Sequence, residues 1–200
     1  MFEETREQYF PDELTPGVVA RAVDRQTITA IWAELSDEME TPFAELGLYT
    51  MPGEQSPRTQ LLREVHSQLH HEYILFYDEA NKPIGWSYGL MHDAITFFMS
   101  WSAILPAYRR RGIYSAFLRH FLPYLQALGY ERVTSNHMVT NRPVLIAKLK
   151  AGFHVTAVSL DERFGAQVQL TYFFDPDRYE GFAQAFSLDG FERPPGYGGA

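Results

Sequence analysis

The feature that most constrains the fold is a short basic turn between an apolar run and a helical pattern. The run covers Ile95 to Ile104, the turn reads LPAYRRRGIY over 105–114, and the helical pattern covers Ser115 to Leu128. A strand that passes through glycine into a helix presents uncapped amides and the positive end of the helix dipole to an anion. Three consecutive arginines add positive charge there. The turn therefore predicts a phosphate-binding site; the alternative is a surface loop whose arginines keep the helix start in water.

Composition limits the classes of function. The chain has 200 residues, a formal net charge of −8 and no cysteine. This length suits one domain, and the acidic charge disfavours a nucleic-acid partner. The lack of cysteine excludes disulfides, thiolate metal sites and a cysteine nucleophile. No apolar run is long enough to span a bilayer, and the acidic start is unlike a signal peptide. We therefore expect a cytoplasmic protein with no membrane partner.

The chain divides into three parts by composition. Residues 1–16 carry five acidic residues and two prolines, which predicts a loosely held N-terminal arm. Residues 17–187 show hydrophobic periodicity, interrupted by a mainly loop segment at 41–57, and are expected to form a single domain. Residues 188–200 are rich in glycine and proline and are expected to be a flexible tail.

The periodicity of the central part predicts alternating strands and helices. An antiparallel meander comes first and helical crossovers follow, which predicts a mixed α/β (α+β) sheet, mainly antiparallel and flanked by helices. Alternation along 95–104 places Phe97, Met99 and Trp101 on one face and Phe98, Ser100 and Ser102 on the other. The expected strands are 17–23, 73–77, 83–91, 95–104, 132–138, 153–159 and 166–174, and the expected helices are 27–39, 57–71, 111–128, 142–150 and 176–186.

The basic turn also contains a spaced motif. Arg109-x-x-Gly112-x-Tyr114 follows a hydrophobic strand end and a Pro-x-Tyr lead-in at 106–108. This pattern resembles the acyl-CoA motif of the GNAT superfamily of acyl-CoA-dependent N-acyltransferases, which reads Gln/Arg-x-x-Gly-x-Gly/Ala at a strand-to-helix turn. The first two defined positions match, and the chain departs from the pattern at Tyr114.

A second motif lies downstream, at 141–153. The spacing from Asn141 to Gly152-Phe153 is similar to the Asn-to-Gly-Phe helix of the same family. Members often carry Ala three residues after the Asn and Tyr four residues before the Gly, whereas this chain has Val144 and Lys148. The resemblance covers 72–174 well and 17–71 only by the order of elements.

The resemblance implies a GNAT-like fold and an activity. The enzyme would transfer an acetyl or similar short acyl group from acetyl-CoA to a primary amine of a small molecule or peptide. The first two helices and the 41–57 loop would form the acceptor side. The departures from the family pattern leave an alternative, a non-catalytic acyl-CoA-binding module with the same fold.

The resemblance also implies which residues contact the cofactor. The amides of 109–115 would bind the CoA pyrophosphate, and a Cβ at Gly112 would block the phosphate or be strained at positive φ. The ring of Tyr114 would have to point away from the phosphate, with room to swing outward, or stack on the cofactor. Asn141 would hold the far side of the slot, with a plain helix N-cap as the alternative. Lys148 is expected to be exposed and to face the CoA phosphates, although burial could instead lower its pKa enough to protonate a thiolate. The full cofactor-binding prediction is Ala103, Ile104 and Leu105 for the pantetheine arm, then Arg109, Arg110, Arg111, Gly112, Ile113, Tyr114, Ser115, Asn141 and Lys148.

Acid–base chemistry needs a group that deprotonates the amine and one that protonates the leaving thiolate. His137, on the strand before the second motif, is the candidate base because imidazole titrates near neutral pH; the alternative is a packed or surface histidine. His92 and Asp93 are further candidates, with Asp93 expected to stabilise its turn. Tyr108 or Tyr114 is the candidate acid.

Two other features carry weaker hypotheses. His66 and His70 have the i, i+4 spacing of metal ligands, but the sequence offers no third ligand, so an exposed polar helix face is expected and no metal is predicted. A homodimer through the late strands or the 175–187 helix is a further hypothesis.

Overall fold

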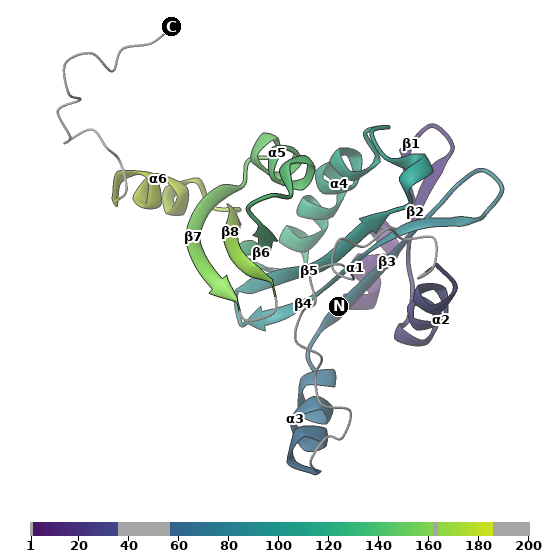
Figure 1. The fold of residues 1–200 in the computed structure, drawn as a ribbon, viewed down its shortest axis with the longest axis horizontal. Coiled ribbons are helices and arrows are strands. Elements are labelled where there is room, and N and C mark those ends of the chain that lie inside the picture. Colours follow the sequence, from purple (N-terminus) through teal and green to yellow (C-terminus); the bar gives the residue numbers. More distant parts are fainter. Residues whose placement is uncertain (1, 36–56, 162–163, 186–200) are drawn as a thin grey trace, which may run out of the picture.

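The computed structural model describes residues 2–35, 57–161 and 164–185 (Figure 1). No helix within these ranges is long and apolar enough to cross a bilayer. The elements in chain order are α1 (Phe2–Tyr9), β1 (Asp12–Thr15), β2 (Val18–Ala22), α2 (Arg25–Leu35), α3 (Pro57–Ser67), β3 (His71–Tyr77), β4 (Pro83–Asp93), β5 (Thr96–Ile104), the 3-10 turn η1 (Pro106–Tyr108), α4 (Ile113–Ala127), β6 (Arg132–Met138), α5 (Arg142–Lys150), β7 (His154–Asp161), β8 (Gly165–Phe173) and α6 (Pro176–Ala185).

The strands form one eight-stranded sheet in the order β1-β2-β3-β4-β5-β6-β8-β7. Strands β1 to β5 form an antiparallel meander, and β6, β8 and β7 continue it in antiparallel pairs. The parallel contact is between β5 and β6, which α4 connects. This arrangement confirms the predicted mixed, mainly antiparallel sheet flanked by helices.

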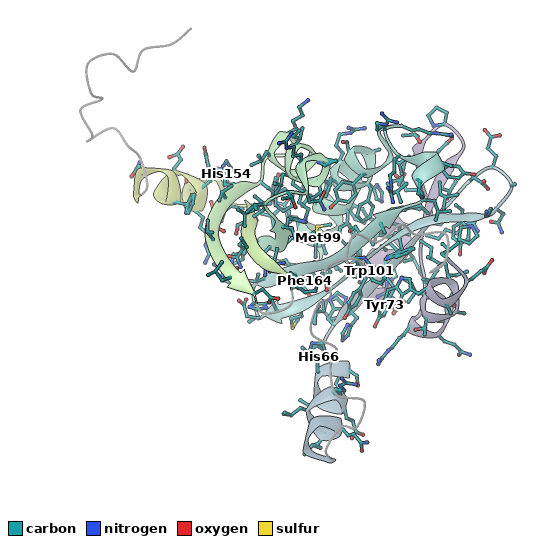
Figure 2. All side chains as sticks on the ribbon, in the orientation of Figure 1. His66, Tyr73, Met99, Trp101, His154 and Phe164 are labelled. Atoms are coloured by element: carbon teal, nitrogen blue, oxygen red, sulfur yellow. The ribbon has the colours of Figure 1, made fainter. Side chains whose placement is uncertain are left out.

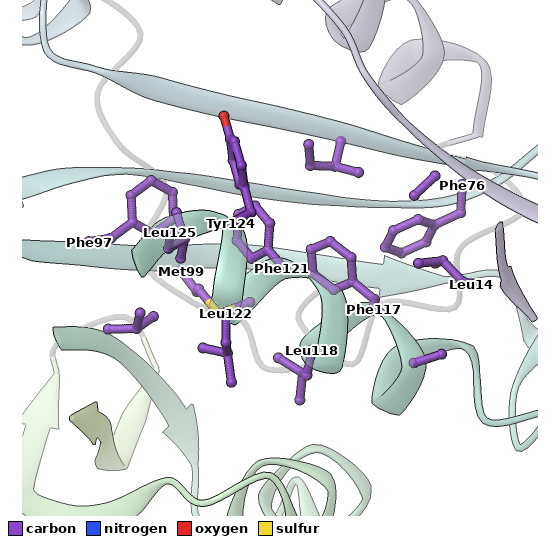
Figure 3. Packing of buried hydrophobic residues seen from close by; sticks show 14 of the residues in the cluster. Leu14, Phe76, Phe97, Met99, Phe117, Leu118, Phe121, Leu122, Tyr124 and Leu125 are labelled. Atoms are coloured by element: carbon purple, nitrogen blue, oxygen red, sulfur yellow. The ribbon is translucent and has the colours of Figure 1, made fainter. Parts of the chain in front are cut away.

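The core lies between the sheet and α4. The inner face of α4 places three aromatic rings, Phe117, Phe121 and Tyr124, against Phe76 and Phe97 of the sheet (Figure 3). On the opposite face, α2 packs a smaller cluster of buried residues, which comprises Ile28, Leu35, Leu75, Trp86 and Leu105. Figure 1 shows α4 and α5 on one side of the sheet and α2 on the other. The chain thus forms three layers, and the sheet separates two apolar clusters.

The N-terminal residues are part of this structure and do not form a loosely held arm. Residues 2–9 and 12–15 form α1 and β1, and Phe10 between them is buried against Tyr124. The Arg6 guanidinium also binds the buried carboxylate of Glu72, with Nη2–Oε1 at 3.1 Å. The acidic composition suggested an arm in water, but one buried aromatic ring and one ion pair attach the segment to the core.

The second predicted helix is shorter than expected. α3 ends at Ser67, and His71 already belongs to β3 because the backbone from His70 onward pairs with β4 (Met91 N to His70 O, 2.8 Å). His66 and His70 therefore do not share a helix face. The apolar residues of α3 remain exposed, by 58–69% for Leu61, Leu62 and Val65. The C-terminal part of the predicted helix 27–39, most of the 41–57 loop and the 188–200 tail lie outside the described residues.

A β-bulge changes the side-chain pattern of β5. The pairing with β4 shifts by one residue at Ser100, so Ser100 is an extra residue on β5. Met99 faces α4, whereas Trp101 lies across the sheet beside Trp32, with ring centroids 5.3 Å apart. The strict alternation predicted for 95–104 is therefore wrong for Trp101, because one inserted residue moves every later side chain to the other face.

Candidate acetyl-CoA site

Strands β5 and β6 separate soon after they meet. Their pairing covers Thr96–Phe98 on β5 and Arg132–Thr134 on β6. Beyond it, β5 stays paired with β4 as far as Ile104, while β6 stays paired with β8 as far as Met138. Each strand thus follows its antiparallel neighbour, and within the described residues the facing edges have no strand between them. We call this opening the split.

The basic turn lies at the end of the split where β5 ends, at Ile104. Arg109 Nε donates to the carbonyl of Ile104 (2.9 Å), the last residue of β5. Arg111 donates to the carbonyl of Ala107 (2.8 Å), and its guanidinium lies over the ring of Tyr108. All three arginines are exposed. The turn therefore keeps a defined shape while leaving positive charge at its surface.

Backbone geometry at the turn suits an anion. Gly112 has φ 79° and is the N-cap of α4, so no side chain caps the first amides of that helix. Arg110 also has a positive φ, of 61°, which costs about 1 kcal/mol or more for a residue with a Cβ. A Cβ on Gly112 would meet no atom within 4 Å. In this structure glycine is therefore required by its φ, and a side chain there would extend into the space in front of the helix amides.

The two candidate tyrosine acids point in different directions. Tyr108 donates to Asp78 Oδ2 (2.7 Å) in the β3–β4 turn, and this hydrogen bond lowers the pKa of the Asp78 carboxyl. Tyr114 turns toward the sheet, where its hydroxyl bonds with Ser102, and burial raises its pKa. The ring of Tyr114 thus points away from the helix N-terminus, but it does so by turning inward and not by swinging outward, because the bulge at Ser100 brings a hydroxyl to this face of β5. The inward ring leaves the helix N-terminus clear.

Lys148 is not the exposed, phosphate-facing side chain predicted from the sequence. It is fully buried, and its Nζ donates to Ser135 Oγ (2.7 Å). Nζ also lies 3.5 Å from Met99 Sδ and 4.6 Å from the centre of the Phe153 ring. Burial lowers the pKa of Lys148 to about 7. The side chain points from α5 into the base of the split.

The candidate base His137 lies beside this lysine. Its Nε2 is 2.9 Å from Ser135 Oγ, so Ser135 connects the two side chains. Burial and the charge of Lys148 lower the pKa of His137 to about 3. The imidazole is therefore neutral at physiological pH and accepts a proton only weakly. His137 is correctly located by the sequence, but its role as base stays a prediction.

Two asparagines border the split. Asn141 is the N-cap residue of α5, as expected, yet its exposed side chain makes no capping hydrogen bond. Asn136 Oδ1, on β6, is buried and has no hydrogen-bond partner among the described residues. A buried carbonyl oxygen favours an N–H donor, and a pantetheine arm carries two amides. Sequence analysis missed Asn136 and Ser135, and it placed Ser102 on the face opposite Met99; only the period-2 spacing of Ser135 and His137 indicated a shared face.

The remaining candidates lie elsewhere. His92 and Asp93 are the last residues of β4, next to the start of β5, where β5 is still paired with β6. Asp93 Oδ1 accepts from the amide of Ile95 (3.0 Å), which confirms its expected role in the turn. Across 2–35, 57–161 and 164–185, no group of three His, Cys, Asp or Glu side chains could hold a metal ion.

The face of the sheet opposite α4 is aromatic beside the split. Trp101 contacts Trp32 and Trp86, with ring centroids 5.3 and 4.8 Å apart. Tyr88 lies edge-on to Trp32 and is stacked on Tyr73. Figure 2 labels Trp101 and Tyr73 close together on this side. Trp101 is 38% exposed, so the cluster presents a ring surface next to the opening.

Comparisons with known proteins agree with this fold. The sequence profile described as the acetyltransferase (GNAT) family matches residues 29–153. The ribosomal-protein-S5-alanine acetyltransferase from Vibrio fischeri is similar in structure, with a TM-score of 0.60 at 12% identity, over 83% of this chain and 97% of that one. Spermidine N-acetyltransferase from Vibrio cholerae, in complex with CoA and spermine, has a TM-score of 0.56 at 11% identity, over 80% and 96%. A ribosomal L7/L12 alpha-N-protein acetyltransferase has a TM-score of 0.58 at 13% identity, over 81% and 93%. No curated protein matches the chain.

The fold and the family match together define the class of protein. A parallel strand pair that separates above an uncapped, arginine-rich helix N-terminus fits an acyl-CoA co-substrate. The profile covers more than half of the chain, so the chain belongs to the acetyltransferase (GNAT) family. It is an acyl-CoA-dependent N-acetyltransferase, which uses acetyl-CoA as co-substrate and an amine as acceptor.

Proposed function

We propose that this enzyme binds acetyl-CoA with the pyrophosphate on the 109–115 turn and the pantetheine arm in the split. The single observation that carries the proposal is the end of β5–β6 pairing at Phe98, followed by an exposed turn with uncapped helix amides. Exposed guanidinium groups and helix N-termini both bind phosphate oxygens. Ala103, Ile104 and Leu105 would offer backbone groups to the arm, and Asn141 would bind it from the opposite side.

Bound in this way, acetyl-CoA supplies an activated acetyl group at the inner end of the split. The chain itself orients the thioester and holds the proton-carrying side chains around it. Tyr114 Oη and His137 Nε2 both lie on the side of the sheet that α4 and α5 cover. Each is hydrogen-bonded to a serine of the split. His137 would pass on the amine proton, directly or through water, although its lowered pKa makes it a weak base.

The proposed acceptor is a primary amine of a small molecule or peptide that approaches over the aromatic face. Trp101 and Tyr88 offer ring surfaces to an apolar or cationic group. The indole N–H groups of Trp32 and Trp86 are buried without partners among the described residues. The V. cholerae neighbour was crystallised with spermine, and another is named for a ribosomal protein amine; both kinds of amine belong in an acceptor panel.

The test measures two properties of the parent and of matched glycine variants. Free-thiol release from acetyl-CoA is followed with an amine panel, and acetyl-CoA affinity is measured by calorimetry. Gly112→Asp places a carboxylate before the phosphate site and should weaken binding at least about tenfold, or about 1.4 kcal/mol. Gly129→Asp is the control, since Gly129 also has positive φ and open space but lies beyond the far end of α4.

The outcomes separate the alternatives. Thiol release that requires an amine supports the enzyme and rejects the non-catalytic acyl-CoA-binding module. Equal acetyl-CoA affinity in Gly112→Asp and Gly129→Asp contradicts the pyrophosphate site. The proposed location is the cytoplasm, where acetyl-CoA is available, and the homodimer through the late strands or α6 is tested by the mass of the protein in solution.

A further inference from the structure

The Nζ atom of Lys148 lies at the point where β5 and β6 part. The last residue pair between these strands is Phe98 with Thr134. The next residue on each strand is Met99 and Ser135, and Nζ lies 3.5 Å from the sulfur of the first and 2.7 Å from the hydroxyl of the second. We call this point the apex of the split. A ligand arm that enters between the strands from the turn ends here.

The charge of Lys148 has no anionic partner. The side chain is fully buried, and its contacts are a hydroxyl, a thioether and the face of the Phe153 ring. No carboxylate within the described ranges forms an ion pair with it. A buried cation without a counter-charge is costly and is rarely kept for stability. The position of Lys148 indicates that a bound ligand supplies the negative charge that the protein does not.

Among the groups around the apex, the amine of Lys148 is the one best suited to give and regain a proton near neutral pH. On β6, His137 is the titratable neighbour, and the lysine charge lowers its pKa further. On α4, Tyr114 directs its hydroxyl to Ser102 on β5. On β5, Met99 contributes only a thioether. Ser135 Oγ accepts from Nζ and is within reach of His137 Nε2, so it fixes the amine at the apex.

We propose that Lys148 donates the proton that the CoA sulfur takes up when the acetyl group leaves. As the new nitrogen–carbon bond forms and the carbon–sulfur bond breaks, the Nζ proton passes to the sulfur. The surplus proton of the acylated nitrogen then returns to the neutral Nζ, directly or by way of His137 and Ser135, so the amide and the CoA thiol leave with Lys148 unchanged. The assignment rests on the proposed function, because acetyl-CoA must occupy the split for the sulfur to reach the apex.

The energetics favour this direction of transfer. A thiol ionises near pH 8.5 in water, whereas burial lowers the pKa of Lys148 to about 7. The ammonium is therefore the stronger acid, and proton transfer to a thiolate is downhill. Near neutral pH the amine also exists in both forms, which lets one group give and regain a proton within a catalytic cycle.

The test replaces only the amine. Lys148→Met keeps the length and apolar stem of the side chain, and Lys150→Met makes the same change at an exposed position of α5. We expect acetyl-CoA affinity to stay within about threefold and kcat of Lys148→Met to fall about 100-fold or more. The pH profile of kcat should lose its decline above neutral pH in Lys148→Met and keep it in Lys150→Met.

A second readout does not depend on turnover. Ultraviolet absorbance of the thiolate reports the ionisation of CoA bound to the enzyme. In the parent and Lys150→Met, the ammonium at the apex should lower the pKa of the bound thiol below that of free CoA. In Lys148→Met, the pKa of the bound thiol should not fall below that of free CoA. If that variant does not fold, the parent titration decides alone, and a bound thiol that ionises no more readily than free CoA overturns the inference.

The failures are distinguishable. If Lys148→Met turns over as fast as Lys150→Met while both bind acetyl-CoA, the role of Lys148 is wrong and the proposed function stands. If the parent neither binds acetyl-CoA nor releases thiol in the presence of any amine, the proposed function and the role of Lys148 are both overturned.

Discussion

Two buried charges on the same side of the sheet have opposite surroundings. The carboxylate of Glu72 on β3 accepts hydrogen bonds from Tyr124 (2.6 Å) and Arg6 (3.1 Å), and His70 Nε2 lies at 2.7 Å. Although burial raises the pKa of Glu72, these partners lower it below its usual value. Lys148 on α5 has a hydroxyl and a thioether instead, and burial alone sets its pKa.

The difference indicates what each charge is for. Glu72 joins α1, β3 and α4 through partners that complete its charge, so its cost of burial is offset within the fold. Lys148 has no such compensation and lies at the apex of the split. A compensated buried charge serves the structure, and we infer that the uncompensated one at the apex serves the reaction.

Removal of the Glu72 carboxylate tests the structural half of this comparison. Glu72→Ala leaves Arg6 without its buried partner and should lower the free energy of unfolding by about 3–5 kcal/mol. The exposed pair Arg178–Glu131 provides the control, and Glu131→Ala should change the free energy of unfolding by less than about 1 kcal/mol. Urea titration measures both. A loss no larger than the control would mean that Glu72 does not hold α1 to the sheet.

The pH dependence of stability tests the lysine half. Unfolding restores the pKa of Lys148 from about 7 to its usual 10.5. Between these values the unfolded state binds one proton more, so the free energy of unfolding rises with pH by about 1.4 kcal/mol per pH unit from this group. Urea titrations of the parent and Lys148→Met from pH 7 to 10 give the difference in slope. Equal slopes would mean that the amine is protonated as easily as in water.

The hydrogen bond between Tyr108 and Asp78 extends the comparison to a carboxylate at the surface, and Tyr108→Phe tests it. The change removes the hydrogen bond to Asp78, whose carboxylate lies in the solvent-facing β3–β4 turn. The free energy of unfolding should fall by about 1 kcal/mol, and kcat should be unchanged. A large loss of kcat with intact stability would restore Tyr108 as the catalytic acid.

The sequence predicted the parts of the site that depend on local signals. The strand end, the arginines and a glycine at positive φ lie within ten residues of each other, and the N-cap at Asn141 is equally local. Hydrophobic periodicity predicted the chain order of the strands from residue 17 onward, but it missed β1, which fell in the predicted arm. These features were recognisable because each depends on neighbours in the chain.

The features that the sequence did not predict depend on long-range pairing. Ile146 and Leu149 are the residues of α5 that an amphipathic pattern would bury, yet they are about half exposed and Lys148 is buried. The side chain is covered only because α5 packs over the end of the β5–β6 pairing. The bulge at Ser100 likewise arises from register with β4. Neither effect leaves a local signal in the sequence.

Hydrogen–deuterium exchange with and without acetyl-CoA tests the central claim most directly. The account predicts slower exchange of the amides of 110–115, which include the uncapped start of α4, and of 99–104 on the free edge of β5. Exchange in β7, at the far edge of the sheet, should stay the same. Unchanged exchange at both 110–115 and 99–104 under saturating acetyl-CoA would contradict the proposed site.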